Sequence, residues 1–180
     1  MDTGSFWHLI DRAREQYEDD AEVVTAKAGD LLAAMPPDEI IAAQQQLWDQ
    51  LAASYTAPLW AAAYVINGGC SDDGFDYFRG WLLAQGRDVF ERALADPDCL
   101  ADHPAVQVAA AEWQDVECEP MLNIAYNAYQ RATGKLLPQN AWHISYPTLG
   151  GDFWFDFEQS DRLAQKLPRL TALHNQQHTG

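Results

Sequence analysis

The sequence is short of basic residues. Only 11 lysines and arginines stand against 27 aspartates and glutamates, which gives a formal net charge of −16. Lysine is especially scarce, because Lys135 and Lys166 are the only two after residue 27. Nucleic-acid binding needs clustered basic side chains that neutralise phosphates, and an anionic membrane surface repels an acidic chain. We therefore expect neither nucleic acid nor a membrane as a partner, and we interpret the acidity as a solubility feature.

Cysteine and long apolar runs are also scarce. The three cysteines, Cys70, Cys99 and Cys118, form no Cys-x-x-Cys pair and no zinc-binding spacing, which argues against a disulfide framework or a zinc site. The apolar run Leu59–Ile66 is far shorter than the roughly 20 residues that cross a bilayer. The N-terminus is acidic and lacks the basic start of a signal peptide. We expect a soluble, cytoplasmic protein with reduced cysteines.

The residues that are abundant suit a helical domain. A chain of 180 residues with 48% apolar and 12% aromatic residues can bury a core as a single domain. Apolar residues at helical spacing predict a mainly α bundle of about six to eight helices. The predicted helices cover residues 6–18, 21–35, 37–66 with a kink or restart at Pro58, 74–95 with a bend at Gly86, 105–113, 119–133 and 160–166. We expect Ser5 to cap the first of them.

The end of the chain has a different texture. The helical core is expected over residues 6–137, followed by an aromatic and acidic appendage over 138–173 and a frayed polar tail over 174–180. Apolar side chains alternate with polar ones over 142–146, and again over 153–157. Such alternation predicts a short C-terminal aromatic hairpin, with an irregular segment as the alternative.

The most informative segment is LWAAAYVINGGCSDDGFDYFRGWLLAQGRDVFE, residues 59–91. An apolar helix leads into the turn at Gly68 and Gly69, three carboxylates follow, and a helix dense in aromatic rings comes next. Rings beside a turn can wall a binding site, although rings at helical spacing more often belong to the core. The candidate ligand-binding residues are Trp60, Tyr64, Asn67, Cys70, Asp72, Asp73, Asp76, Tyr77 and Arg79.

The three carboxylates allow two interpretations. Asp72, Asp73 and Asp76 offer the oxygen ligands that Mg²⁺ and Ca²⁺ prefer, but their spacing is not that of an EF-hand loop. The favoured alternative is structural: Ser71, Asp72 or Asp73 caps the next helix, and Asp76 complements its dipole. We therefore expect no metal and no cofactor.

Arg79 and Cys70 are each open to two interpretations as well. Arg79 and Arg87 together could bind a carboxylate or phosphate, but an ion pair with its stem packed on rings is favoured for Arg79. Cys70 precedes a helix N-terminus, where a thiol can become nucleophilic. The sequence pairs no histidine with it as a base, so an inert half-buried cysteine is favoured.

Two segments carry a family resemblance. FWHLIDRAR near the N-terminus and LWAAAYVINGGCSDDGFDYFRGWLLAQGRDVFERAL resemble the bacterial family called domain of unknown function 4240, which is common in actinobacteria. The resemblance extends from Phe6 to about Leu137. Family members tend to close with an acidic stretch and a Tyr-Pro-x-Leu-like motif, of which residues 156–158 and 167–170 are looser versions. The resemblance implies that the Trp142–Tyr146 segment is an insertion relative to the family. The resemblance implies a small helical domain and no known activity.

The leading functional hypothesis is a binding module, not an enzyme, with its site at the Gly68–Asp76 turn. Its ligand would be a protein partner or a small molecule, and a homodimer is a further expectation. The alternative is an enzyme that uses Asp72, Asp73 or Asp76 with Arg79, with Mg²⁺ as a possible requirement of that alternative. A third hypothesis is an accessory protein whose negative surface masks a basic partner.

Overall fold

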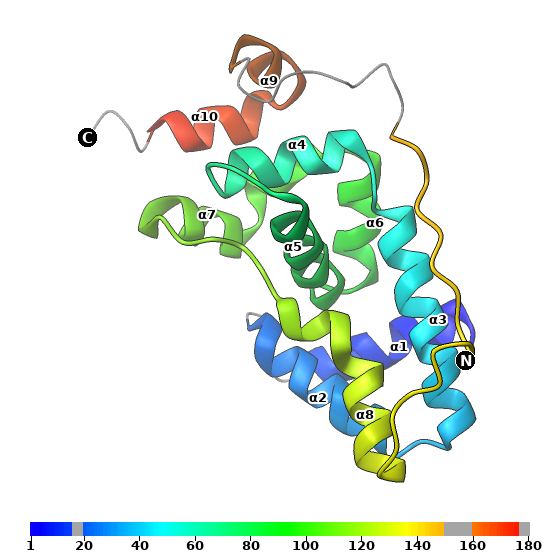
Figure 1. Cartoon of the computed structure of the whole chain (residues 1–180). Helices are drawn as coiled ribbons and strands as arrows, with labels where there is room; N and C mark the ends of the chain where they lie inside the picture. The colour runs from blue at the N-terminus through cyan, green and yellow to red at the C-terminus, as the bar shows by residue number, and fades with distance from the viewer. Residues whose placement is uncertain (16–19, 150–159, 177–180) are drawn as a thin grey trace.

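The computed structural model describes residues 1–15, 20–149 and 160–176, and these residues contain helices but no strand. The predicted all-α fold is confirmed. The lower half of the molecule in Figure 1 holds the first three helices and a later one that packs against the second and third of them. These are α1 (Thr3–Arg14), α2 (Ala21–Ala33), α3 (Pro37–Ala53) and α8 (Ile124–Thr133).

Acidic caps set the starts of the first two helices. Asp2 accepts a hydrogen bond from the Ser5 backbone N–H at 2.7 Å, so α1 begins earlier than predicted and Ser5 is not its cap. Asp20 accepts from the backbone N–H groups of Glu22 and Val23 at the start of α2. Both aspartates satisfy donors that a helix N-terminus leaves unpaired.

The upper half is built around one buried helix. Helix α5 (Asp72–Ala84) packs against α1, α2 and α3 of the lower half, and against α4 (Ala57–Ile66) and α6 (Arg87–Ala95) (Figure 1). Its first two residues are exposed, but every residue from Phe78 to Ala84 is buried, as expected where other helices enclose it. The other elements of this half are the 3₁₀ helix η1 (Pro97–Asp102) and α7 (Pro104–Glu112). A second 3₁₀ helix, η2 (Glu119–Asn123), lies below α5 in Figure 1 and also contacts α2 and α8.

The predicted helix over 119–133 is divided into η2 and α8, and it ends at Gly134 as expected. Gly134 has φ +70°, the left-handed conformation that glycine adopts without a steric penalty. The predicted break before α4 is also present, although the helix begins at Ala57 with Thr56 as its cap.

The C-terminal helices α9 (Ser160–Lys166) and α10 (Pro168–Gln176) lie at the top of Figure 1, and α10 packs against α4, α7 and η1. The sequence pattern did not predict α10, and His174, where a frayed tail was expected to begin, is helical. The buried carboxylate of Asp98 in η1 accepts from the backbone N–H groups of Arg169 and Leu170 at 3.0–3.1 Å. A side chain from η1 therefore satisfies the free donors at the start of α10.

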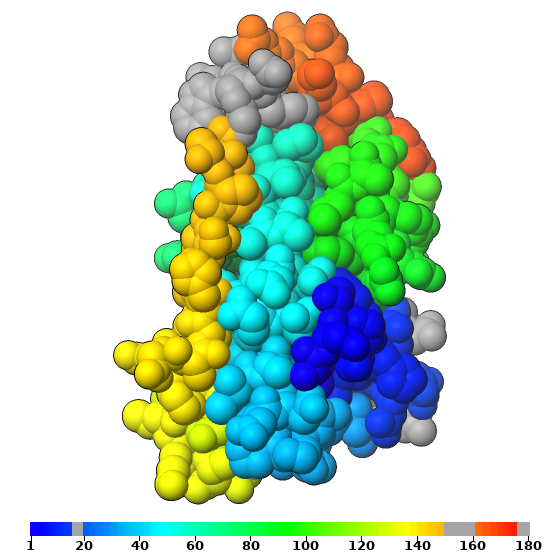
Figure 2. All heavy atoms as spheres, turned by 90° about the vertical axis from the view of Figure 1, so that its right-hand side faces the viewer, coloured from blue at the N-terminus to red at the C-terminus, as the bar shows by residue number. Residues whose placement is uncertain are grey.

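Residues 135–149 contain no strand and no helix, and they form a strap that runs along α3. Figure 2 shows this strap as a band on the surface beside α3. The irregular alternative is therefore correct for residues 142–146. The other predicted arm of a hairpin, residues 153–157, lies outside the described residues.

Candidate functional site

The N-terminus of α5 is capped by Ser71. Its hydroxyl accepts from the Gly74 backbone N–H at 3.1 Å. Asp72 and Asp73 are exposed in the first helical turn, where their charges complement the dipole. Of the three capping residues considered from the sequence, Ser71 is the one whose side chain accepts this bond.

Replacing Ser71 with alanine should lower the free energy of unfolding by about 0.5–2 kcal/mol, because the Gly74 donor loses its partner. Asp73→Ala should cost only about 0.3–1 kcal/mol, since it removes only a favourable charge near the helix start. Urea unfolding of the two variants side by side measures both values. A larger loss for Asp73→Ala would show that Asp73 caps the helix in solution.

The acids after the turn do not converge. Asp72 and Asp73 are exposed, whereas Asp76 pairs with the Arg79 guanidinium one turn along the same helix. Within residues 1–15, 20–149 and 160–176, no three His, Cys, Asp or Glu side chains form a group that could hold a metal ion. This arrangement fits the structural interpretation of the three carboxylates better than a cation site.

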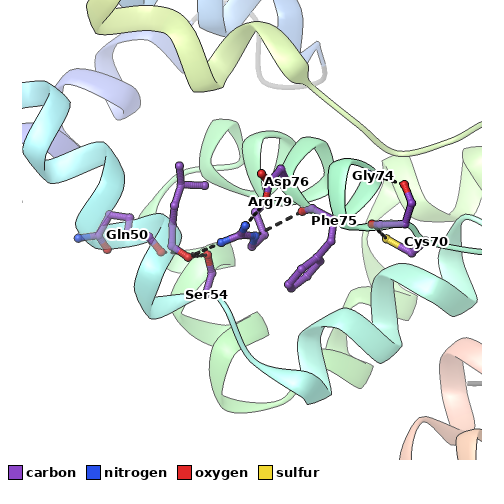
Figure 3. A network of polar contacts seen from close by, with 9 residues as sticks. Gln50, Ser54, Cys70, Gly74, Phe75, Asp76 and Arg79 are labelled. Atoms are coloured by element: carbon purple, nitrogen blue, oxygen red, sulfur yellow. Dashed lines mark hydrogen bonds and ion pairs between the residues drawn. The ribbon is translucent and has the colours of Figure 1, made fainter. Parts of the chain in front are cut away.

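Arg79 is fully buried and points from α5 towards the end of α3, as Figure 3 shows. Its guanidinium donates to the Leu51 carbonyl at 2.5 Å, to the Phe75 carbonyl at 3.4 Å and to the Asp76 carboxylate. The faces of the Phe75 and Tyr55 rings lie 4.7 and 5.1 Å from its central carbon. The predicted internal ion pair packed on rings is present. Arg87 is exposed and pairs with Glu91 instead.

Cys70 is half-buried beside the Ser71 cap (Figure 3). Burial, followed by the negative charge of Asp115, raises the pKa of the Cys70 thiol to about 12. A thiol with this pKa stays protonated at neutral pH and is a poor nucleophile. The Cys70 carbonyl accepts from the Trp60 indole at 3.1 Å, so this turn is tied to α4. The chemistry of Cys70 is that of a structural cysteine.

Asn67 and the two tyrosines have different surroundings. Asn67 pairs with the backbone of Val116 in both directions, at 2.9 and 3.4 Å, and it lines a hollow of about 70 Å³ with Gly68, Trp113 and His174. Tyr64 in α4 and Tyr77 in α5 are each partly exposed. The nearby carboxylate of Glu119 is the main cause of a raised pKa at Tyr77. A ligand site at the Gly68–Asp76 turn stays a prediction.

A larger hollow lies at a place that no local sequence pattern indicates. A groove of about 740 Å³ runs between the strap and the corner where α3 meets α4. Its walls include Trp48, Tyr55 and Asp49 from the helical side and His143 from the strap, and the lining residues that the structure describes include no lysine or arginine. The groove depends on two segments nearly a hundred residues apart, so periodicity along the chain cannot reveal it.

Two amide side chains fix the carboxylate in this groove. Gln45 donates to one Asp49 oxygen at 2.8 Å, and Gln46 donates to the other at 3.5 Å. Gln45 also holds the strap, because its side chain accepts from the His143 N–H at 2.8 Å and donates to the His143 carbonyl at 3.1 Å. One glutamine therefore links the acid, the helix and the strap.

Comparison with known proteins identifies the helical core. A sequence profile of the family described as protein of unknown function (DUF4240) matches residues 1–131. The chain belongs to this family. The match ends within α8, so the strap, α9 and α10 of this DUF4240 protein all lie beyond the matched region. No curated protein and no solved structure matches the chain significantly. Among the described helices, none has the length and apolar character needed to cross a bilayer.

Proposed function

We propose that this DUF4240 protein is a non-enzymatic binding module and that the groove between α3, α4 and the strap holds a basic side chain of a protein partner. The observation that carries the proposal is the lining of the groove. The Trp48 and Tyr55 rings line the same groove as the anchored Asp49 carboxylate, and the described lining holds no lysine or arginine that would pair with this carboxylate.

Aromatic rings and a carboxylate that line one groove favour the binding of a cation. A lysine or arginine side chain gains cation–π contact with an aromatic face and charge pairing with a carboxylate. A volume of about 740 Å³ lies within the range of ordinary ligand pockets, so a long side chain with its flanking backbone fits. The net charge of −16 supports the same choice, because it attracts basic partners at long range.

The enzymatic alternative has less support from the described residues. Arg79 is enclosed by packing and hydrogen bonds, Cys70 is held protonated, and the acids after the turn are separated. A binding role requires none of these groups to react. The choice of a partner segment over a small molecule rests on the net charge of the chain, which attracts basic partners at long range.

Three blocked pentapeptides that differ only at the central residue test the proposal. Acetyl-Ala-Ala-X-Ala-Ala-amide with X = Arg should shift the NMR signal of the Trp48 indole, whereas X = Gln should have less effect and X = Glu none. Asp49→Asn should weaken binding of the arginine peptide roughly three- to fivefold, and added salt should weaken it too.

The matched control is Asp38→Asn, which removes a charge from the first turn of α3 outside the groove lining. It should leave the affinity for the arginine peptide nearly unchanged. Equal binding of the arginine and glutamate peptides, or an Asp38→Asn effect as large as that of Asp49→Asn, would refute a groove built for cations.

A further inference from the structure

The strap docks on α3 through its main chain and through two aromatic rings. Its main chain is held at His143, whose N–H and carbonyl both bond to the Gln45 side chain. Contacts of this type recognise an extended backbone whatever side chain it carries. One residue earlier, the Trp142 ring stacks on the Trp48 ring with centroids 5.7 Å apart and planes at 2°. The face of Trp48 is therefore a first socket for an aromatic ring.

A second socket receives Tyr146. Its ring lies 5.1 Å from the Tyr55 ring and 6.3 Å from Trp48, in an edge-on arrangement with the latter. The central carbon of Arg79 lies 5.8 Å from the Tyr146 ring. Because Arg79 is held by hydrogen bonds from behind, this cation is fixed in place before a ring arrives. A cation that is already held in place beside the rings of Tyr55 and Trp48 favours the binding of a further aromatic side chain.

The strap occupies both sockets but remains largely exposed to solvent. Residues 143–148 are exposed, and 45% of Tyr146 remains open to solvent. The indole N–H groups of Trp48 and Trp142 are buried and have no hydrogen-bond partner among the described residues. Unpaired buried donors weaken docking. The strap also lies outside the region that matches the family, whereas Gln45, Trp48, Tyr55 and Arg79 lie inside it.

We propose that the α3 surface is a receptor for an extended peptide with two aromatic side chains four residues apart, and that residues 142–146 occupy it in cis. The inference rests on the proposed use of this surface for protein binding, and it adds a second mode of binding. An aromatic, extended segment displaces the strap, whereas a basic side chain enters the groove with the strap in place. A tethered segment acts at an effective concentration on the order of millimolar, so even a weakly docked strap keeps the sockets filled.

The test uses the full-length protein and a fluorescent peptide of residues 140–149, NAWHISYPTL, followed by anisotropy. The double variant Trp142→Ala/Tyr146→Ala frees both sockets and should bind the peptide at least tenfold more tightly than the unmodified chain. Adding Gln45→Ala to the double variant should reduce that affinity at least fivefold. A peptide with alanine in place of its tryptophan and tyrosine should not bind.

Tyr146→Ala alone provides a second measurement, because it removes a half-exposed ring and leaves the rest of the strap in place. It should bind the peptide with intermediate affinity. Equal affinity of the unmodified chain and the double variant would overturn the proposal, as would the absence of binding to a double variant with unchanged circular dichroism. Binding of the arginine pentapeptide to the unmodified chain requires no displacement of the strap, so the two proposals can fail separately.

Discussion

Replacing Arg79 with alanine should lower the free energy of unfolding by about 3–5 kcal/mol, the range seen when one partner of a buried, hydrogen-bonded charge is removed. The change deletes a fully buried side chain, its bonds to two backbone carbonyls and its contacts with the rings around it. It leaves a cavity between α3 and α5 that neighbouring helices can close only in part. Urea unfolding followed by circular dichroism measures the loss.

Arg87→Ala is the matched control for this experiment. Arg87 is 50% exposed and pairs with Glu91 one turn along α6. Exposed pairs of this type contribute about 0.3–0.5 kcal/mol, so the control should be nearly neutral. If Arg79→Ala costs no more than Arg87→Ala, the buried guanidinium is not a support of the fold.

Arg79 contributes both to the stability of the fold and to the candidate binding surface. The same guanidinium ties α5 to the last turn of α3 and lies behind the Tyr146 ring of the strap. A residue that stabilises the core therefore also forms the floor of the second aromatic socket. Arg79→Ala therefore affects both the stability of the fold and the affinity for the peptide, whereas a change at Gln45 leaves this buried guanidinium in place.

Helix positions could be predicted because they depend on short-range periodicity. The turn at Gly68 and the stop at Gly134 are local features as well. The ends of the helices were harder to predict from the sequence. Asp2 begins α1 before its apolar pattern starts, and α10 begins with donors that are satisfied by Asp98, some seventy residues away in sequence. A helix start stabilised by a distant side chain gives no capping signal next to it.

The same distinction applies to the candidate site. The packing of Arg79 on the Phe75 ring and its pairing with Asp76 were predicted, since all three residues lie on one helix. The bond from Arg79 to the Leu51 carbonyl and the Gln45–His143 pair were not, because they join segments 28 and 98 residues apart. The groove consists of such long-range contacts. The groove combines side chains of α3 with those of the strap, and only the folded chain brings these two segments together.

Gly80→Ala should destabilise the chain by about 2–3 kcal/mol, although alanine is the better helix former. Gly80 lies in the middle of α5, and a Cβ there would overlap the carbonyl oxygen of Cys118. Cys118 cannot easily move away, because its N–H donates to the Tyr77 carbonyl at 2.9 Å. Only a residue without a side chain permits this close approach of the chain to α5.

Gly29→Ala is the matched control, and we expect it to have the opposite sign. Gly29 is also buried within a helix, but a Cβ there would meet only the end of the Arg131 side chain, at 4.0 Å. The substitution should therefore stabilise α2 by about 0.5–1 kcal/mol through helix propensity. Thermal or urea unfolding of both variants distinguishes a steric requirement from a general effect of glycine. Two changes of the same sign would contradict the close contact between α5 and the segment that leads into η2.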